Sequence, residues 1–161
     1  MLVHWIWFSL RQNVSDRMKV ELLQHFRDPE EIFYAGKDAF RNVEGLTEES
    51  FASLQEKDLQ KAEWVLRQCE KEKLGILTYQ DAAYPSRLKN IPDPPMVLYY
   101  KGRLPDFDAQ PFIGVVGTRG ATAYGLTAAK KMGYQIACCG GALVSGAAEG
   151  IDAASMSGAL T

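Results

Sequence analysis

Residues that bind metals or form disulfides are scarce in this sequence. It has three cysteines, Cys69 and the adjacent pair Cys138 and Cys139, and only two histidines. Neighbouring cysteines are poorly placed to bridge each other, and no second pair stands at the spacing of a zinc site. We therefore expect reduced cysteines, no metal and a cytoplasmic chain. At the end of a helix, Cys138 and Cys139 are expected to fill the core.

Long hydrophobic runs and a strong charge of either sign are also absent. The apolar residues 1–10 are too few to span a bilayer and carry no basic leader or cleavage site, so we expect a buried first helix and no membrane segment. The formal net charge is −2, while residues 111–161 hold a small excess of basic side chains. A polyanion would therefore be held by a local basic site and not by a global field.

What the sequence does contain, up to about residue 73, is a series of short helical patterns. Met18, Leu22 and Phe26 recur at helical spacing, and Asp28 followed by Pro29 is a typical helix start. These patterns predict a small all-helical domain with one buried face on each helix.

Two features of this helical front allow more than one interpretation. Gly45 is expected in a left-handed turn before a helix capped by Thr47. Such a hairpin can bind nucleic-acid phosphates, although three nearby glutamates favour a packing or protein-contact role. Trp64 lies on a long helix of about residues 56–73, where it can stack a base or pack at a domain interface.

The segment after the helices is expected to be largely extended. Residues 75–78 and 96–100 predict short strands, and the consecutive prolines between residues 91 and 95 exclude a helix there. We therefore place the domain boundary at the start of this segment. It separates a helical, helix-hairpin-helix-like domain of residues 1–75 from a second domain of residues 76–161.

Two stretches organise the second domain, residues 112–119 and residues 142–152. Each is a short apolar run that breaks at glycine and leads into helix-compatible sequence, as a strand, phosphate loop and helix do. Two such units in succession predict two neighbouring parallel strands. Glycine at a strand end lets an anion approach the backbone, and the following helix start offers unpaired N–H groups. We expect both loops to present bare amides, with Arg119 beside them.

A series of short motifs runs through this half of the chain. They are Tyr84-Pro85 with Leu88, Ile91–Pro95, Leu98–Gly102, Val116–Arg119, Tyr124-Gly125 and Ser145–Asp152. Their order and spacing resemble those of the DprA (Smf) family of DNA-processing proteins. The resemblance implies an α/β fold, in which an incomplete extended Rossmann-like parallel sheet follows a small, sterile-alpha-motif-like helical domain. It also implies that later strands and the usual dimer surface lie beyond Thr161, so we expect an amino-terminal portion of such a protein.

The same resemblance implies a function without catalysis or a cofactor. Its members bind and protect single-stranded DNA and help to load the RecA recombinase during natural transformation. Arg119 matches the arginine expected to hold DNA phosphate. By position, the other phosphate-binding residues are Gly117, Thr118, Thr122, Tyr124 and Gly125 in the first loop and Ser145, Gly146, Gly150 and Asp152 in the second. Thr122 replaces the usual serine, and Ser155-Met156 replaces the usual Ala-His.

The glycine loops match neither of the common nucleotide-binding motifs. No Gly-Lys-Ser/Thr follows, as a Walker loop requires, and the glycines miss the dinucleotide fingerprint. What remains is an anion cradle with one arginine, whose planar fork can bind two phosphate oxygens. The competing hypothesis is an enzyme or sensor for small nucleotides, for which Glu149 and Asp152 are the nearby acids.

Overall fold

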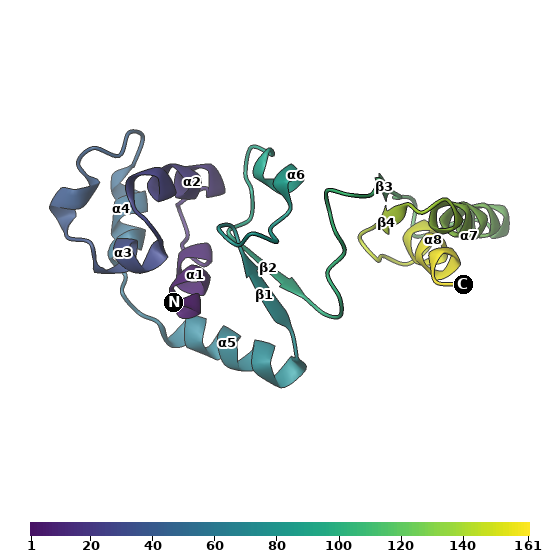
Figure 1. Ribbon diagram of the computed structural model, residues 1–161, viewed down its shortest axis with the longest axis horizontal. Coiled ribbons are helices and arrows are strands. Elements are labelled where there is room, and N and C mark those ends of the chain that lie inside the picture. Colours follow the sequence, from purple (N-terminus) through teal and green to yellow (C-terminus); the bar gives the residue numbers. More distant parts are fainter. The chain divides into compact units, whose positions relative to one another are not determined.

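Five α-helices and one 3-10 helix precede the first strand, as the helical patterns predict (Figure 1). The computed structural model describes residues 1–161. The helices are α1 (Leu2–Ser9), α2 (Asp16–His25), α3 (Pro29–Tyr34), η1 (Lys37–Phe40), α4 (Glu48–Gln55) and α5 (Gln60–Glu72). Two predicted helix starts are confirmed, because Asp28 and Thr47 accept the N–H groups of Glu31 and Ser50. Gly45 has the predicted left-handed backbone, with φ +76°.

The core of the helical part is aromatic and centres on α1. Ile6, Trp7 and Phe8 are completely buried, which confirms the predicted buried first helix. The Trp7 and Phe33 rings meet edge to face with centroids 5.0 Å apart, and Trp7 Nε1 donates to the Glu56 carbonyl at 2.9 Å. Burying a large apolar side chain contributes about 1.5–3 kcal/mol, so this cluster is a principal source of stability. None of the helices combines the length and apolar character that a bilayer crossing requires.

A two-stranded antiparallel sheet follows α5 and belongs to the same compact unit. Strand β1 (Gly75–Thr78) pairs with β2 (Val97–Tyr100), with the short helix α6 (Ser86–Lys89) between them. Met96 and Val97 are buried in the same cluster as the α1 aromatics. The first compact unit, unit 1, therefore extends over residues 1–104. The boundary placed at residues 75–76 falls inside it, because the apolar face of the sheet packs on the helices.

The second compact unit, unit 2, comprises residues 105–161 and holds both glycine loops. Strand β3 (Phe112–Gly114) pairs in parallel with β4 (Ala142–Val144), which confirms the prediction of two neighbouring parallel strands. Helix α7 (Ala123–Cys138) connects the strands, and α8 (Ile151–Ala159) follows β4. In Figure 1, α7 and α8 lie side by side, with the two strands near one end.

The packing of α7 on α8 depends on glycine. A Cβ at Gly133 would overlap the carbonyl oxygen of Ser155, and one at Gly158 would overlap that of Lys130. The two helices therefore approach with almost no side chain between them at these points. This contact holds the helix that follows the first loop against the helix that follows the second.

The two cysteines at the end of α7 are exposed, so the expectation that they fill the core is wrong. The buried face of α7 is made by Ala129, Gly133 and Ile136, which recur at helical spacing. Cys138 comes two residues after Ile136 and therefore points away from that face.

Candidate nucleic-acid interface

The two glycine loops lie at one edge of the β3–β4 sheet. Because the strands are parallel, their carboxyl ends share an edge, and each loop begins there. The Val115 N–H donates to the Val144 carbonyl at 2.9 Å, which continues the pairing into the first loop. The first loop, residues 115–122, therefore starts beside the second, residues 145–150.

Asp152, in the first turn of α8, ties the loops together. It is only 3% exposed, and its Oδ1 accepts the Gly117 N–H at 3.0 Å. The pKa of Asp152 lies below its usual range because polar groups of the loops stabilise the carboxylate: the Ser145 hydroxyl, the Gly117 amide and, less strongly, the amides of Gly146 and Ala148. Burial acts in the opposite direction and raises this pKa. Ser145 Oγ itself makes no hydrogen bond of standard geometry, so the Gly117 bond is the better defined of these contacts.

This arrangement corrects the expectation of bare amides at one position. The Gly117 N–H already has an anionic partner inside the protein, and it is not open to a ligand. Asp152 is buried behind the loop and braces it from within. The sequence placed Gly117 and Asp152 in the same candidate site, but it did not separate residues that build the loop from residues that line its surface.

The backbone of the second loop fixes the first loop at Thr118 and Arg119. Gly150 has φ +86°, and a Cβ there would meet the carbonyl oxygens of both residues. The Ile151 N–H donates to the Thr118 carbonyl at 3.2 Å, and a Cβ at Gly117 would lie 2.6 Å from that of Ile151. Sequence reasoning missed Ile151, because nothing in the pattern distinguishes it from an ordinary helix residue.

Arg119 is the cationic group of this edge. Its side chain is exposed and forms no ion pair with any of the 161 described residues. The N–H groups of Thr118 and Arg119 make no hydrogen bond, whereas the Gly120 N–H donates to Thr118 Oγ1 at 3.2 Å. An anion at this point can therefore meet two open amides as well as the guanidinium.

The remaining predicted residues of the first loop lie at the start of α7. Thr122 is the N-cap, and its hydroxyl accepts the Gly125 N–H at 3.2 Å. A hydroxyl is what this position requires, and threonine supplies it as serine would. Tyr124 is 84% exposed, and no interaction joins it to Arg119. Tyr124 is thus available to a ligand, but the structure does not bring it together with the arginine.

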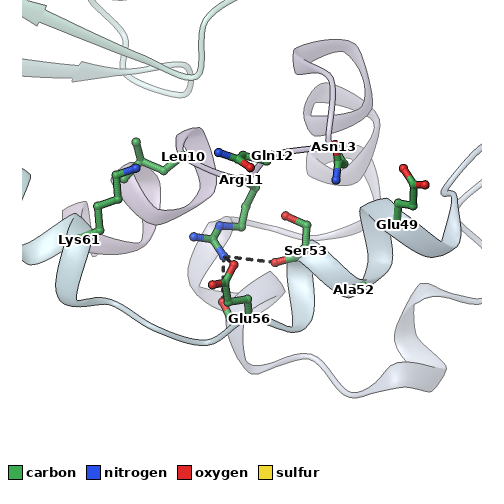
Figure 2. A pocket seen from close by; sticks show the side chains of 9 residues that line it. All are labelled: Leu10, Arg11, Gln12, Asn13, Glu49, Ala52, Ser53, Glu56 and Lys61. Carbon is green, nitrogen blue, oxygen red and sulfur yellow. Dashed lines mark hydrogen bonds and ion pairs between the residues drawn. The ribbon is translucent and has the colours of Figure 1, made fainter.

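A surface pocket in unit 1 contains another arginine, Arg11, which we considered as an anion-binding group (Figure 2). The pocket has a volume of about 570 Å³ and lies between α4 and the residues that follow α1. Arg11 donates to the Glu56 carboxylate at 2.9 Å and to the Ser53 carbonyl at 3.3 Å, as the dashed lines in Figure 2 mark. These internal partners occupy the guanidinium, so this pocket is a poor anion site.

Comparison with known proteins gives a consistent match. The family model described as DNA recombination-mediator protein A matches residues 75–161. Protein Smf of Synechocystis is 33% identical over 98% of this chain and 40% of its own length. The DNA processing protein DprA of Bacillus subtilis is 38% identical over 55% of this chain and 30% of its own length. The chain thus spans less than half the length of these relatives.

The fold has a solved counterpart. The crystal structure of DNA processing protein A from Streptococcus pneumoniae superposes with a TM-score of 0.69 at 22% identity, over 99% of this chain and 54% of that one. This likeness and the parallel β3–β4 pair confirm an α/β, Rossmann-like fold preceded by helices. The family model and the relative that is 33% identical over almost the whole chain agree with each other. This protein therefore belongs to the DNA recombination-mediator protein A family, which includes the DprA and Smf proteins.

Proposed function

We propose that the protein binds single-stranded DNA without enzymatic turnover. In this proposal it acts in the cytoplasm during natural transformation, where it protects incoming strands and passes them to a RecA-type recombinase. Family membership supports a role in DNA processing, since the Bacillus subtilis relative is named a DNA processing protein. The geometry of the first glycine loop supports DNA as the ligand.

The observation that carries the proposal is the state of Arg119. Its guanidinium is exposed and unpaired, two open amides adjoin it, and Gly150 and Asp152 brace the loop from behind. A phosphodiester would accept charge-assisted hydrogen bonds from these donors. Such contacts do not read base identity, so binding should have little sequence preference and a strong dependence on salt.

The test is the substitution Arg119→Ala in the full chain. The binding free energy for an unstructured oligonucleotide, measured by fluorescence anisotropy at low salt, should weaken by about 1.5–3 kcal/mol, which is a loss of affinity of roughly 10- to 150-fold. The matched control is Lys130→Ala, which removes an equal charge from an exposed site on α7 and should change affinity much less. An Arg119→Ala protein that is folded and binds as tightly as the unchanged protein would falsify this function.

An enzyme or sensor for small nucleotides is the alternative that this experiment must exclude. Such a site needs an acid or a base, and Asp152 is held ionised and buried by the loop amides, which leaves Glu149 as the exposed acid. We expect no saturable binding of nucleoside monophosphates. Binding of the monomer, with release of base or phosphate, would replace our proposal with the alternative.

A further inference from the structure

Trp64 on α5 is the exposed member of the three tryptophans. Its side chain is 57% exposed, whereas Trp5 and Trp7 lie in the core of unit 1. Helix α5 already has a buried face, which Ala62 and Cys69 provide. The exposed indole is therefore not needed for the packing of this helix.

The side chains around Trp64 form a continuous strip on the outer face of α5. At about 100° per residue, the residues within about 60° of Trp64 are all basic or carry an amide. Together with Trp64 we call them the Trp64 stripe; they are Gln60, Lys61, Arg67, Gln68 and Lys71. The three glutamates of α5 lie about 80° or more from Trp64 on the same wheel. The stripe thus combines an aromatic face with cations and contains no acid.

The cations of the stripe are available to an anionic ligand. Lys71 and Lys61 form no ion pair, and Lys61 reaches the rim of the pocket in Figure 2. Arg67 approaches Glu63 at 3.8 Å, but both side chains are more than half exposed, so this pair is weak and easily exchanged.

We propose that the Trp64 stripe is a second contact for single-stranded nucleic acid, located on unit 1. A base stacks on the Trp64 indole, and Arg67 and Lys71 bind the phosphates that follow it. Only an unpaired strand offers a free base face for stacking. From Trp64 to Lys71 the helix rises about 10 Å, the length of about three stacked nucleotides. This inference rests on the proposed function for the kind of ligand, but it uses different residues on a different unit.

The composition of the stripe favours nucleic acid over a protein partner. A protein-docking face normally has an apolar centre of several side chains. Here one indole stands alone among cations and amides, which is how sequence-tolerant binding of single strands combines stacking with charge.

Tryptophan fluorescence tests the proposal directly in the full chain. Titration with an unlabelled oligothymidylate of about 16 nucleotides should quench part of the emission and shield it from acrylamide. In Trp64→Phe this change should disappear, because Trp5 and Trp7 are buried in both proteins. Trp64→Ala should weaken binding about tenfold. Arg67→Ala with Lys71→Ala should weaken it too, whereas Lys73→Ala, an exposed cation at the end of α5 on its opposite side, should not.

Arg119→Ala separates this inference from the proposed function. If both hold, this variant binds more weakly, but saturating oligonucleotide still quenches Trp64. If Arg119→Ala binds normally and Trp64 is quenched, the stripe stands and the loop function fails. Oligonucleotide binding that leaves the emission and acrylamide access of Trp64 unchanged overturns the stripe alone. The stripe proposal is also overturned if Trp64 is protected from acrylamide in the DNA-free protein at concentrations where the protein self-associates. The face that carries Trp64 would then be a protein interface.

Discussion

Units 1 and 2 are each stabilised by a different kind of internal packing. Unit 1 buries large side chains such as Trp7, Phe8 and Leu22, whereas Ala129 and Ile136 are the buried hydrophobic residues of unit 2. Unit 2 relies on close backbone approach at its glycines and on the bond from Gly117 to a buried carboxylate. An aromatic core gives stability that tolerates some surface change. A glycine-packed unit gives less stability, but it brings backbone amides to the surface in defined positions.

The arginines of the two units show the same difference. Arg11 in unit 1 is bound to internal carbonyls and to Glu56, whereas Arg119 in unit 2 has no internal partner. The first arginine secures the packing of helices, and the second remains available for a ligand. Of these two arginines, Arg119 is therefore the one whose guanidinium an anionic ligand can reach.

Truncation of one large side chain in each unit gives the largest expected effect. Phe8→Ala should lower the free energy of unfolding of unit 1 by about 3–5 kcal/mol, because it opens a cavity in a fully buried cluster. Ile113→Ala in unit 2 should cost less than about 1 kcal/mol, because Ile113 is already 41% exposed. Urea unfolding followed by circular dichroism measures both. Equal losses would mean that the difference in core density does not control stability.

Substitution of a helix-contact glycine should destabilise unit 2 and spare unit 1. Gly133→Ala places a methyl group against the backbone of α8 and should cost about 1–3 kcal/mol. Gly120→Ala is the control, because a Cβ there meets nothing within 4 Å. Amide hydrogen exchange should show faster exchange in α7 and α8 only. Unchanged protection of both helices would show that they have room for a side chain.

Mild acid should affect unit 1 before unit 2. His4 is 1% exposed, both ring nitrogens lack hydrogen-bond partners, and burial holds its pKa below 6.5. The charges near it are Glu30, with Oε2 3.7 Å from Nδ1, and Asp28 and the Met1 amino group. Because the folded pKa is lowered, the stability linked to His4 is complete above pH 6.5. It is lost as the pH falls through the folded value.

The measurement is the melting temperature of unit 1 between neutral pH and about pH 5, where His4→Phe should melt higher in acid than the unchanged protein. Asp152 provides the contrast in unit 2. Its pKa is lowered from 3.8, so its contribution is complete above that pH and is lost only as the pH falls further. The Gly117 amide should therefore stay protected from exchange at about pH 5. Loss of that protection together with the His4 transition would mean that the units do not respond to acid separately.

Local features of the fold followed well from the sequence, and long-range contacts did not. The caps at Asp28 and Thr47 and the turn at Gly45 depend on residues a few positions apart, and all three predictions were right. The bond from Gly117 to Asp152 joins residues 35 positions apart, so no local pattern indicates that the first loop already contains an anion. The exposure of Cys138 depends in the same way on which face of α7 meets α8.

The packing of Met96 and Val97 on the α1 aromatics also has a practical consequence for dividing the chain in the laboratory. The family match begins at residue 75, which makes a cut just before β1 an obvious choice. Such a cut would separate these two side chains from the helices and expose a hydrophobic surface to solvent on each fragment. A recombinant fragment of residues 1–104 would keep this surface buried, because it contains the whole of unit 1.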